Sequence, residues 1–137
     1  MKCINAVRPL LPAALALSAA AQAAPADFVG TWTVPGETRS ITRVVVTAQG
    51  GRLMLRAFGK CSPTDCDWGL VPLTTFGSSV TDADHRVALA TYDHGFSRAT
   101  LVLTLRGRAA LYLQGLTQFT DSSVRQNYST SATLTKN

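Results

Sequence analysis

The feature that most constrains the fold is a two-residue alternation of side chains in the segment 98–106. One face of this segment carries only aliphatic residues, namely Ala99, Leu101, Leu103 and Leu105. The other face begins and ends with arginine. Successive side chains of a β-strand point to opposite faces of the sheet, so this period of two predicts a half-buried strand. The segment 52–58 repeats the pattern, with Leu53, Leu55 and Ala57 on one face and basic residues on the other.

Similar runs follow one another along the chain and are separated by turn signals such as Pro35-Gly36 and Gly50-Gly51. No convincing helix is predicted after the N-terminal segment. The predicted strands are 29–34, 39–49, 52–58, 68–76, 85–92, 98–106, 110–120 and 125–136.

Eight strands joined by short turns form a meander, and its apolar face must be covered. Closing the sheet into a barrel covers that face and removes the exposed edges. We therefore predict an all-β, eight-stranded antiparallel up-and-down β-barrel; the alternative is a β-sandwich, which usually needs longer crossovers. A barrel of this size is either filled by its own side chains or holds one small ligand.

The first 23 residues read as a secretory signal peptide. Lys2 and Arg8 precede an apolar run over 10–20, and Ala21-Gln22-Ala23 supplies small residues for cleavage. No later run approaches the roughly 20 apolar residues of a membrane-spanning helix. We expect a single domain over 24–137, secreted or periplasmic, with no membrane span.

Two cysteines remain after this segment, Cys61 and Cys66. An even count in an exported chain indicates a disulfide. Pro63 and Asp65 favour the tight turn that so small a ring requires. A redox-active pair is disfavoured because the spacing is not Cys-x-x-Cys. We predict a structural disulfide that closes the loop between two strands.

Charge and motifs exclude several functions. The whole chain has a net charge of +5, and removing Lys2 and Arg8 leaves +3 without any basic cluster, which disfavours nucleic-acid binding. There is no Gly-x-Ser-x-Gly or His-Glu-x-x-His motif, and Glu37 is the only glutamate. We expect no enzymatic activity and no cofactor.

Two loops contain residues that could be imagined to hold a metal: Asp82, Asp84 and His85 in one, Asp93 and His94 in the next. A divalent-ion loop needs further oxygen ligands at regular spacing, and these are missing. Aspartates in loops usually form hydrogen bonds within their own turn. No metal site is therefore predicted.

Aromatic residues occur in nearly all the predicted strands, and most are expected to fill the interior. Trp68 directly follows the cysteine loop, so it could close the base of the barrel or lie at a ligand mouth. The candidate ligand contacts are Trp32, Trp68, Tyr92 and Tyr128.

Gly30-Thr31-Trp32 on the first strand, followed by seven more strands, resembles the calycin superfamily of lipocalins and avidins. In that superfamily the tryptophan packs at one end of the barrel against a basic side chain of the last strand. The resemblance implies that Gly30, Trp32 and Lys136 close the barrel. The tryptophan-lined biotin site of avidins is not reproduced, because only one other tryptophan, Trp68, is present.

Two further resemblances are narrower. The segment from Lys60 to Gly69, Lys-Cys-x-Pro-Thr-Asp-Cys-Asp-Trp-Gly, resembles one in small, uncharacterised secreted bacterial domains, which implies no activity. The overall pattern also resembles periplasmic metalloprotease inhibitors of bacteria, which insert their mature N-terminus into the protease; the matching segment here would be 24–27. The disulfide of those inhibitors spans a longer stretch.

Together these features predict a non-enzymatic binding protein that holds a small apolar or amphipathic ligand in the barrel. The alternative is an interaction module with a solid core, such as a protease inhibitor or an envelope or adhesion protein, that acts on a protein partner through its outer surface.

Overall fold

The computed structural model describes residues 23–36, 38 and 40–137, so most of the predicted signal peptide lies outside the described residues. A single turn of 3₁₀ helix, η1, spans Pro25–Phe28. The strands are β1 (Gly30–Thr33), β2 (Ile41–Gln49), β3 (Arg52–Gly59), β4 (Cys66–Phe76), β5 (Val87–Asp93), β6 (Ser97–Arg106), β7 (Ala110–Phe119) and β8 (Tyr128–Lys136).

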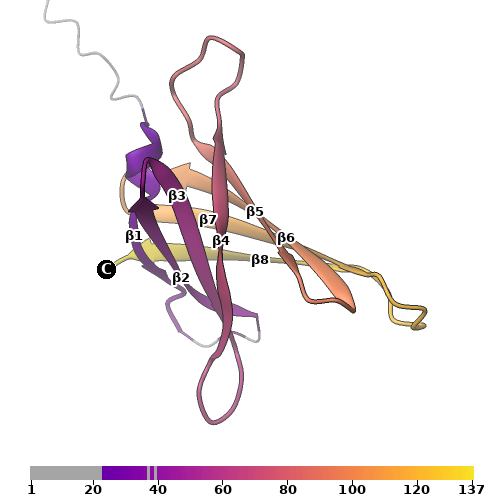
Figure 1. Cartoon of the computed structure of the whole chain (residues 1–137). Coiled ribbons are helices and arrows are strands. Elements are labelled where there is room, and N and C mark those ends of the chain that lie inside the picture. Colours follow the sequence, from indigo (N-terminus) through magenta and orange to yellow (C-terminus); the bar gives the residue numbers. More distant parts are fainter. Residues whose placement is uncertain (1–22, 37, 39) are drawn as a thin grey trace, which may run out of the picture.

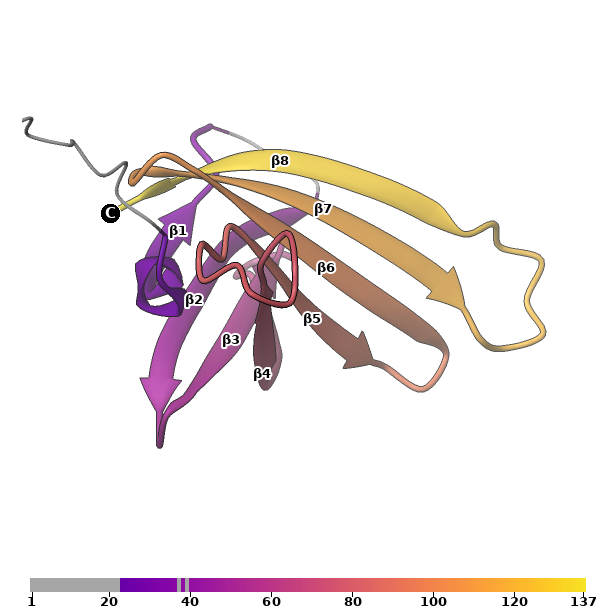
Figure 2. The same cartoon turned by 90° about the horizontal axis from the view of Figure 1, so that it is seen from above.

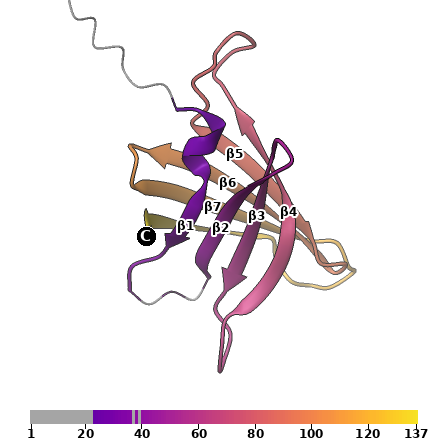
Figure 3. The same ribbon diagram turned by 60° about the vertical axis from the view of Figure 1, so that its left-hand side comes forward.

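The strands form one closed barrel in sequence order, and every neighbouring pair is antiparallel. The predicted up-and-down barrel is therefore confirmed, and the sandwich is excluded. Strands β2–β4 run at a steep angle to β6–β8 (Figure 1). Figure 3 shows β1–β4 in front of β5–β8, and the core lies between these two halves.

The predicted inward faces are also confirmed. In β6 the four aliphatic residues at 99, 101, 103 and 105 are buried, and in β3 Leu55 and Ala57 are buried while Leu53 is half-buried. Leucines of β7 and β8 are buried in the same core; they include Leu111, Leu113 and Leu134, each at most 1% exposed. The interior of the barrel is thus lined by buried apolar side chains.

Among the strands that begin later than predicted, β5 and β8 are delayed by polar contacts. β5 starts at Val87 because His85 is bound elsewhere: its N–H donates to the carbonyl of Ala23 at 2.8 Å, and its Nδ1 bonds Thr75 Oγ1. β8 starts at Tyr128 because Arg125 folds back to Asp121 at 2.8 Å within the preceding loop. In both places a local or long-range polar contact replaces strand pairing.

The two ends of the barrel differ. The closed end carries η1, the 107–109 turn and Lys136. The open end carries the loops 60–65, 94–96 and 120–127, and Figure 2 shows the last of these on the side away from η1. β4 pairs with β5 only over Thr74–Phe76, so the two strands separate toward the open end.

At the closed end, Phe28 and Trp32 are fully buried, and the Trp32 Nε1–H donates to the Phe28 carbonyl at 2.9 Å. The Lys136 ammonium lies 5.4 Å from the Trp32 ring centroid. Its side chain crosses Gly30, where φ is +145° and an added Cβ would lie 2.6 Å from Lys136 Cε. Gly30 therefore allows the lysine to cover the tryptophan. Residues 24–27, the segment that the inhibitor resemblance singles out, form the N-cap and the first three residues of η1.

Candidate functional site

The first wall of the site begins at a β-bulge between β3 and β4. Arg56 pairs with Leu70 and Phe58 with Asp67, so Trp68 and Gly69 together lie opposite the single residue Ala57. Gly69 has a φ of +90°, which glycine adopts most readily. The extra residue bends β4 and sets the direction of Trp68.

The hydroxyl of Tyr92 fills the interruption that this bulge leaves in the hydrogen-bond ladder. It accepts from the Ala57 N–H at 2.9 Å and lies 2.9 Å from the Gly69 carbonyl, to which it can donate. Burial raises the pKa of Tyr92 to about 12, while the hydrogen bond from Ala57 acts in the opposite direction. Tyr92 thus ties β5 to β3 and β4 where the strands no longer pair directly.

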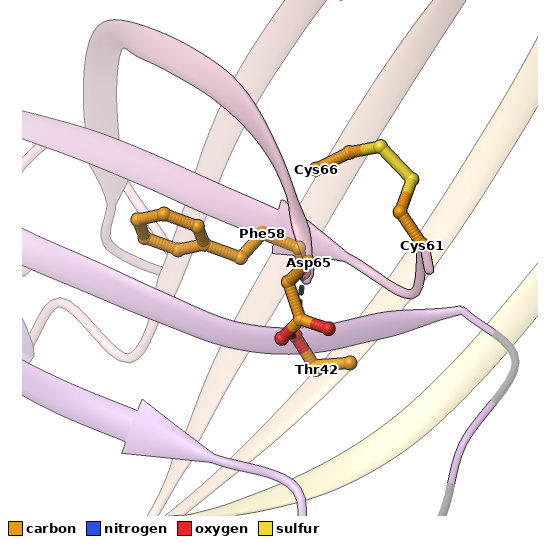
Figure 4. Close-up of a disulfide and its surroundings, with 5 residues drawn as sticks. All are labelled: Thr42, Phe58, Cys61, Asp65 and Cys66. Atoms are coloured by element: carbon orange, nitrogen blue, oxygen red, sulfur yellow. Dashed lines mark hydrogen bonds between the residues drawn. A yellow bond between two sulfur atoms is a disulfide. The ribbon is translucent and has the colours of Figure 1, made fainter. Parts of the chain in front are cut away.

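A disulfide-closed loop holds the start of β4. Cys61 and Cys66 are joined, as predicted, with their Cα atoms 5.4 Å apart (Figure 4). The carboxylate of Asp65 in this loop accepts a hydrogen bond from the Thr42 hydroxyl at 2.6 Å. The loop is therefore fixed to β2 as well as to its own strand pair.

Asp67 adds a second anchor next to Trp68. Its carboxylate accepts the Gly69 N–H at 2.8 Å and pairs with the Arg56 guanidinium at 2.6 Å. These contacts, the Gly69 hydrogen bond first and then Arg56, hold the pKa of Asp67 below its usual value. Asp67 is therefore ionised and already partnered at neutral pH.

Four rings stack along this wall. Trp68 meets Tyr92 and His94 edge-on, with centroids 5.5 and 5.3 Å apart. His94 lies parallel to Tyr92 at 5.9 Å and stacks on Phe96 at 6.3 Å. The stack extends from the buried Tyr92 to Phe96, which is 49% exposed. It therefore presents a continuous aromatic surface from the core to solvent.

The second wall comes from β6, β7 and β8. Phe119 and Tyr128 lie 6.2 Å apart, and the guanidinium of Arg125 stacks over Phe119 at 4.2 Å. The same guanidinium lies 5.3 Å from the Phe96 ring, so Arg125 bridges the two walls at the outer rim.

A cleft of about 480 Å³ lies between these walls, lined by Asp67, Trp68, His94, Phe96, Ser97, Ala99, Thr117, Phe119, Arg125 and Tyr128. A second space of about 150 Å³ continues inward from Trp68, Ala99, Thr117 and Tyr128 to Ile41, Gly59 and Lys60. Because four residues line both, we treat them as one site and call it the open-end cleft. Its size falls within the range of small-molecule sites.

Of the four predicted ligand contacts, the structure places two in the cleft and two elsewhere. Trp68 and Tyr128 line the open-end cleft. Tyr92 lies behind Trp68 and is 3% exposed, so it supports the wall. Trp32 lies at the closed end, is fully buried and uses its N–H internally. Of the three predicted closure residues, Lys136 contacts both Gly30 and Trp32.

Sequence reasoning missed several residues of the cleft, chiefly His94, Phe96, Ser97 and Arg125. One signal was present: rings occur at positions 92, 94 and 96, a spacing of two that continues one strand face into the following loop.

In the acidic loop before β5, Asp82 forms its hydrogen bonds within the loop itself. The carboxylate of Asp82 accepts hydrogen bonds from the Ser78 hydroxyl and N–H and from the Asp84 N–H. The Ser78 contacts are the main reason that the pKa of Asp82 falls to about 2. Among the described residues, no three histidine, cysteine or acidic side chains gather closely enough to hold a metal.

Within the part of the chain that the structure describes, no helix has the length and apolar character needed to cross a membrane.

Comparison with known proteins gives no assignment. No protein-family model matches the chain, and no curated protein or solved structure is significantly similar to it.

Proposed function

We propose that this protein is an exported, non-enzymatic binding protein that takes a small apolar or amphipathic ligand in the open-end cleft. The observation that carries the proposal is the pair of aromatic walls around a space of about 480 Å³. Sites for small molecules are typically concave and apolar, with a few polar groups for orientation. The larger of the two spaces lies at the mouth of the barrel, so the proposal places the ligand there rather than deep in the interior.

The barrel and its closed end support a calycin-type assignment. The sequence-ordered eight-stranded meander and the packing of Lys136 on Trp32 match what the resemblance to that superfamily implies. The Cys61–Cys66 disulfide supports export to the periplasm or beyond, because disulfides persist in oxidising compartments.

The direct test measures binding of a neutral apolar dye, phenylnaphthylamine, to wild-type protein and to Phe96→Ala. Removing one stacked ring should weaken binding about fivefold, which corresponds to about 1 kcal/mol. Phe76→Ala is a matched control, because Phe76 is 46% exposed and lies at the other end of β4. Equal weakening by both substitutions, or no dye binding at all, would contradict the proposal.

A second measurement concerns the natural ligand. Native mass spectrometry of protein purified from its own host should show a retained mass of a small molecule, and Phe96→Ala should lower its occupancy while Phe76→Ala leaves it unchanged.

A further inference from the structure

Every polar side chain that is free in the open-end cleft can donate a hydrogen bond, and two of them, Lys60 and Trp68, can only donate. Six of its side chains have no hydrogen-bond partner within the described part of the chain, namely Lys60, Trp68, His94, Ser97, Thr117 and Tyr128. An ammonium and an indole N–H can only donate, and a hydroxyl can do so.

The carboxylates around the same cleft are already in use. The carboxylate of Asp67 is bound by Arg56 and by the Gly69 N–H, and Asp121 pairs with Arg125. These two ion pairs cancel in charge. Lys60 is left as the unneutralised charge among the residues that line the cleft.

The inner end of the cleft brings two of these donors together. An added Cβ on Gly59 would lie 2.8 Å from Trp68 Nε1, so the indole nitrogen sits directly over this glycine. Lys60 is the next residue, and both Gly59 and Lys60 line the inner space. The indole N–H and the lysine chain therefore lie at the same end.

The outer end is bounded by a flat group of the protein itself. The guanidinium of Arg125, itself planar, lies 4.2 Å from the ring centroid of Phe119 on one wall and 5.3 Å from that of Phe96 on the other. These distances match the stacking of one planar group against each ring.

We propose that the open-end cleft is specific for planar aromatic or conjugated anions, with the ring between the aromatic walls and the acidic group at the Gly59–Lys60 end. This inference rests on the proposed binding function and names its ligand class. A carboxylate, sulfonate or phosphate on a flat ring would use the donors that the protein leaves free and would meet Lys60 as its counter-charge.

The test compares two dyes with the same ring system, anilinonaphthalene sulfonate and the neutral phenylnaphthylamine, by fluorescence titration at low ionic strength. Wild-type protein should bind the sulfonate about fivefold more tightly, as one partly exposed ion pair allows. Lys60→Gln should remove this preference and leave affinity for the neutral dye unchanged. Arg52→Gln, an exposed change at the start of β3 away from the cleft, should leave both affinities unchanged.

The outcomes separate the two proposals. Equal binding of both dyes, or a preference that survives in Lys60→Gln, overturns the anion specificity while the binding cleft stands. Failure of both dyes to bind overturns the binding function as well. A preference lost in Lys60→Gln and kept in Arg52→Gln supports both.

Discussion

The two tryptophans of the chain show how its two ends differ. Trp32, at the closed end, is fully buried, and its N–H donates to the Phe28 carbonyl. Trp68, at the open end, is half-buried, and its N–H has no partner among the described residues. Both rings pack against other groups, yet only one of them has its polar atom satisfied.

This difference separates stability from recognition. A buried indole with a satisfied N–H contributes its full apolar area at no polar cost. An indole with a free N–H beside a cleft gives up part of that contribution but keeps a donor for a ligand. We therefore expect substitutions at the closed end to change folding and substitutions at the open end to change binding.

The largest expected effect is that of Trp32→Ala, which should lower the free energy of unfolding by about 3 to 5 kcal/mol because it leaves a cavity in the core. Trp68→Ala should cost about 1 to 2 kcal/mol, since a half-buried side chain loses less apolar area. Urea denaturation followed by circular dichroism measures both.

If Trp32→Ala does not fold, Trp32→Phe provides the same test in a milder form. It keeps an aromatic ring but leaves the Phe28 carbonyl without its donor. Similar costs at positions 32 and 68 would contradict the division between the two ends.

The next largest effect is expected at Tyr92, whose hydroxyl joins the buried core to the wall of the open-end cleft. Tyr92→Phe should lower the free energy of unfolding by about 2 kcal/mol, because it removes only the hydroxyl and leaves the buried Ala57 N–H unsatisfied. Dye affinity should fall too, since β4 and Trp68 lose their tie to β5. Tyr112→Phe is the control; Tyr112 stacks with Arg106 on the outer face of β7.

The same variant gives a pH test. The pKa of Tyr92 is raised to about 12 in the folded protein, from an ordinary value of 10.0. Its contribution to stability is therefore complete below pH 10 and is lost as pH rises toward 12. The alkaline loss of thermal stability should be smaller in Tyr92→Phe than in wild type, and an unchanged loss would show that the hydroxyl does not matter.

The barrel was predictable because its cause is local. Alternation in segments such as 98–106 specifies both the strand and its buried face, and the short turns leave few ways to arrange the strands. The disulfide was predictable for the same reason, since its two cysteines are five residues apart.

The open-end cleft depends on contacts between distant segments and was predicted only in part. Trp68 and Tyr128 were candidates because they are aromatic, but Ser97 and Arg125 carry no local signal. Their place in the cleft depends on how the loops 94–96 and 120–127 come together, which no alternation pattern specifies. Trp32 was placed among the ligand candidates because residue type alone does not distinguish a core tryptophan from one at a surface.

The smallest expected effect is that of Asp82→Asn in the loop before β5, and it tests whether a charged loop at the closed end is independent of the cleft. The folded pKa of Asp82 is about 2, below its ordinary value of 3.8, because the Ser78 hydroxyl and the N–H groups of Ser78 and Asp84 bind the carboxylate. The ionised Asp82 therefore stabilises the folded state at pH values above its ordinary pKa of 3.8, and this stabilisation is lost as the pH falls toward 2. Melting temperatures between pH 5 and pH 2 should therefore fall less steeply in Asp82→Asn than in wild type, whereas dye binding at neutral pH should be the same in both. A change in dye affinity would mean that the closed-end loop influences the cleft through the β4–β5 pairing, and the two ends could then no longer be treated as separate.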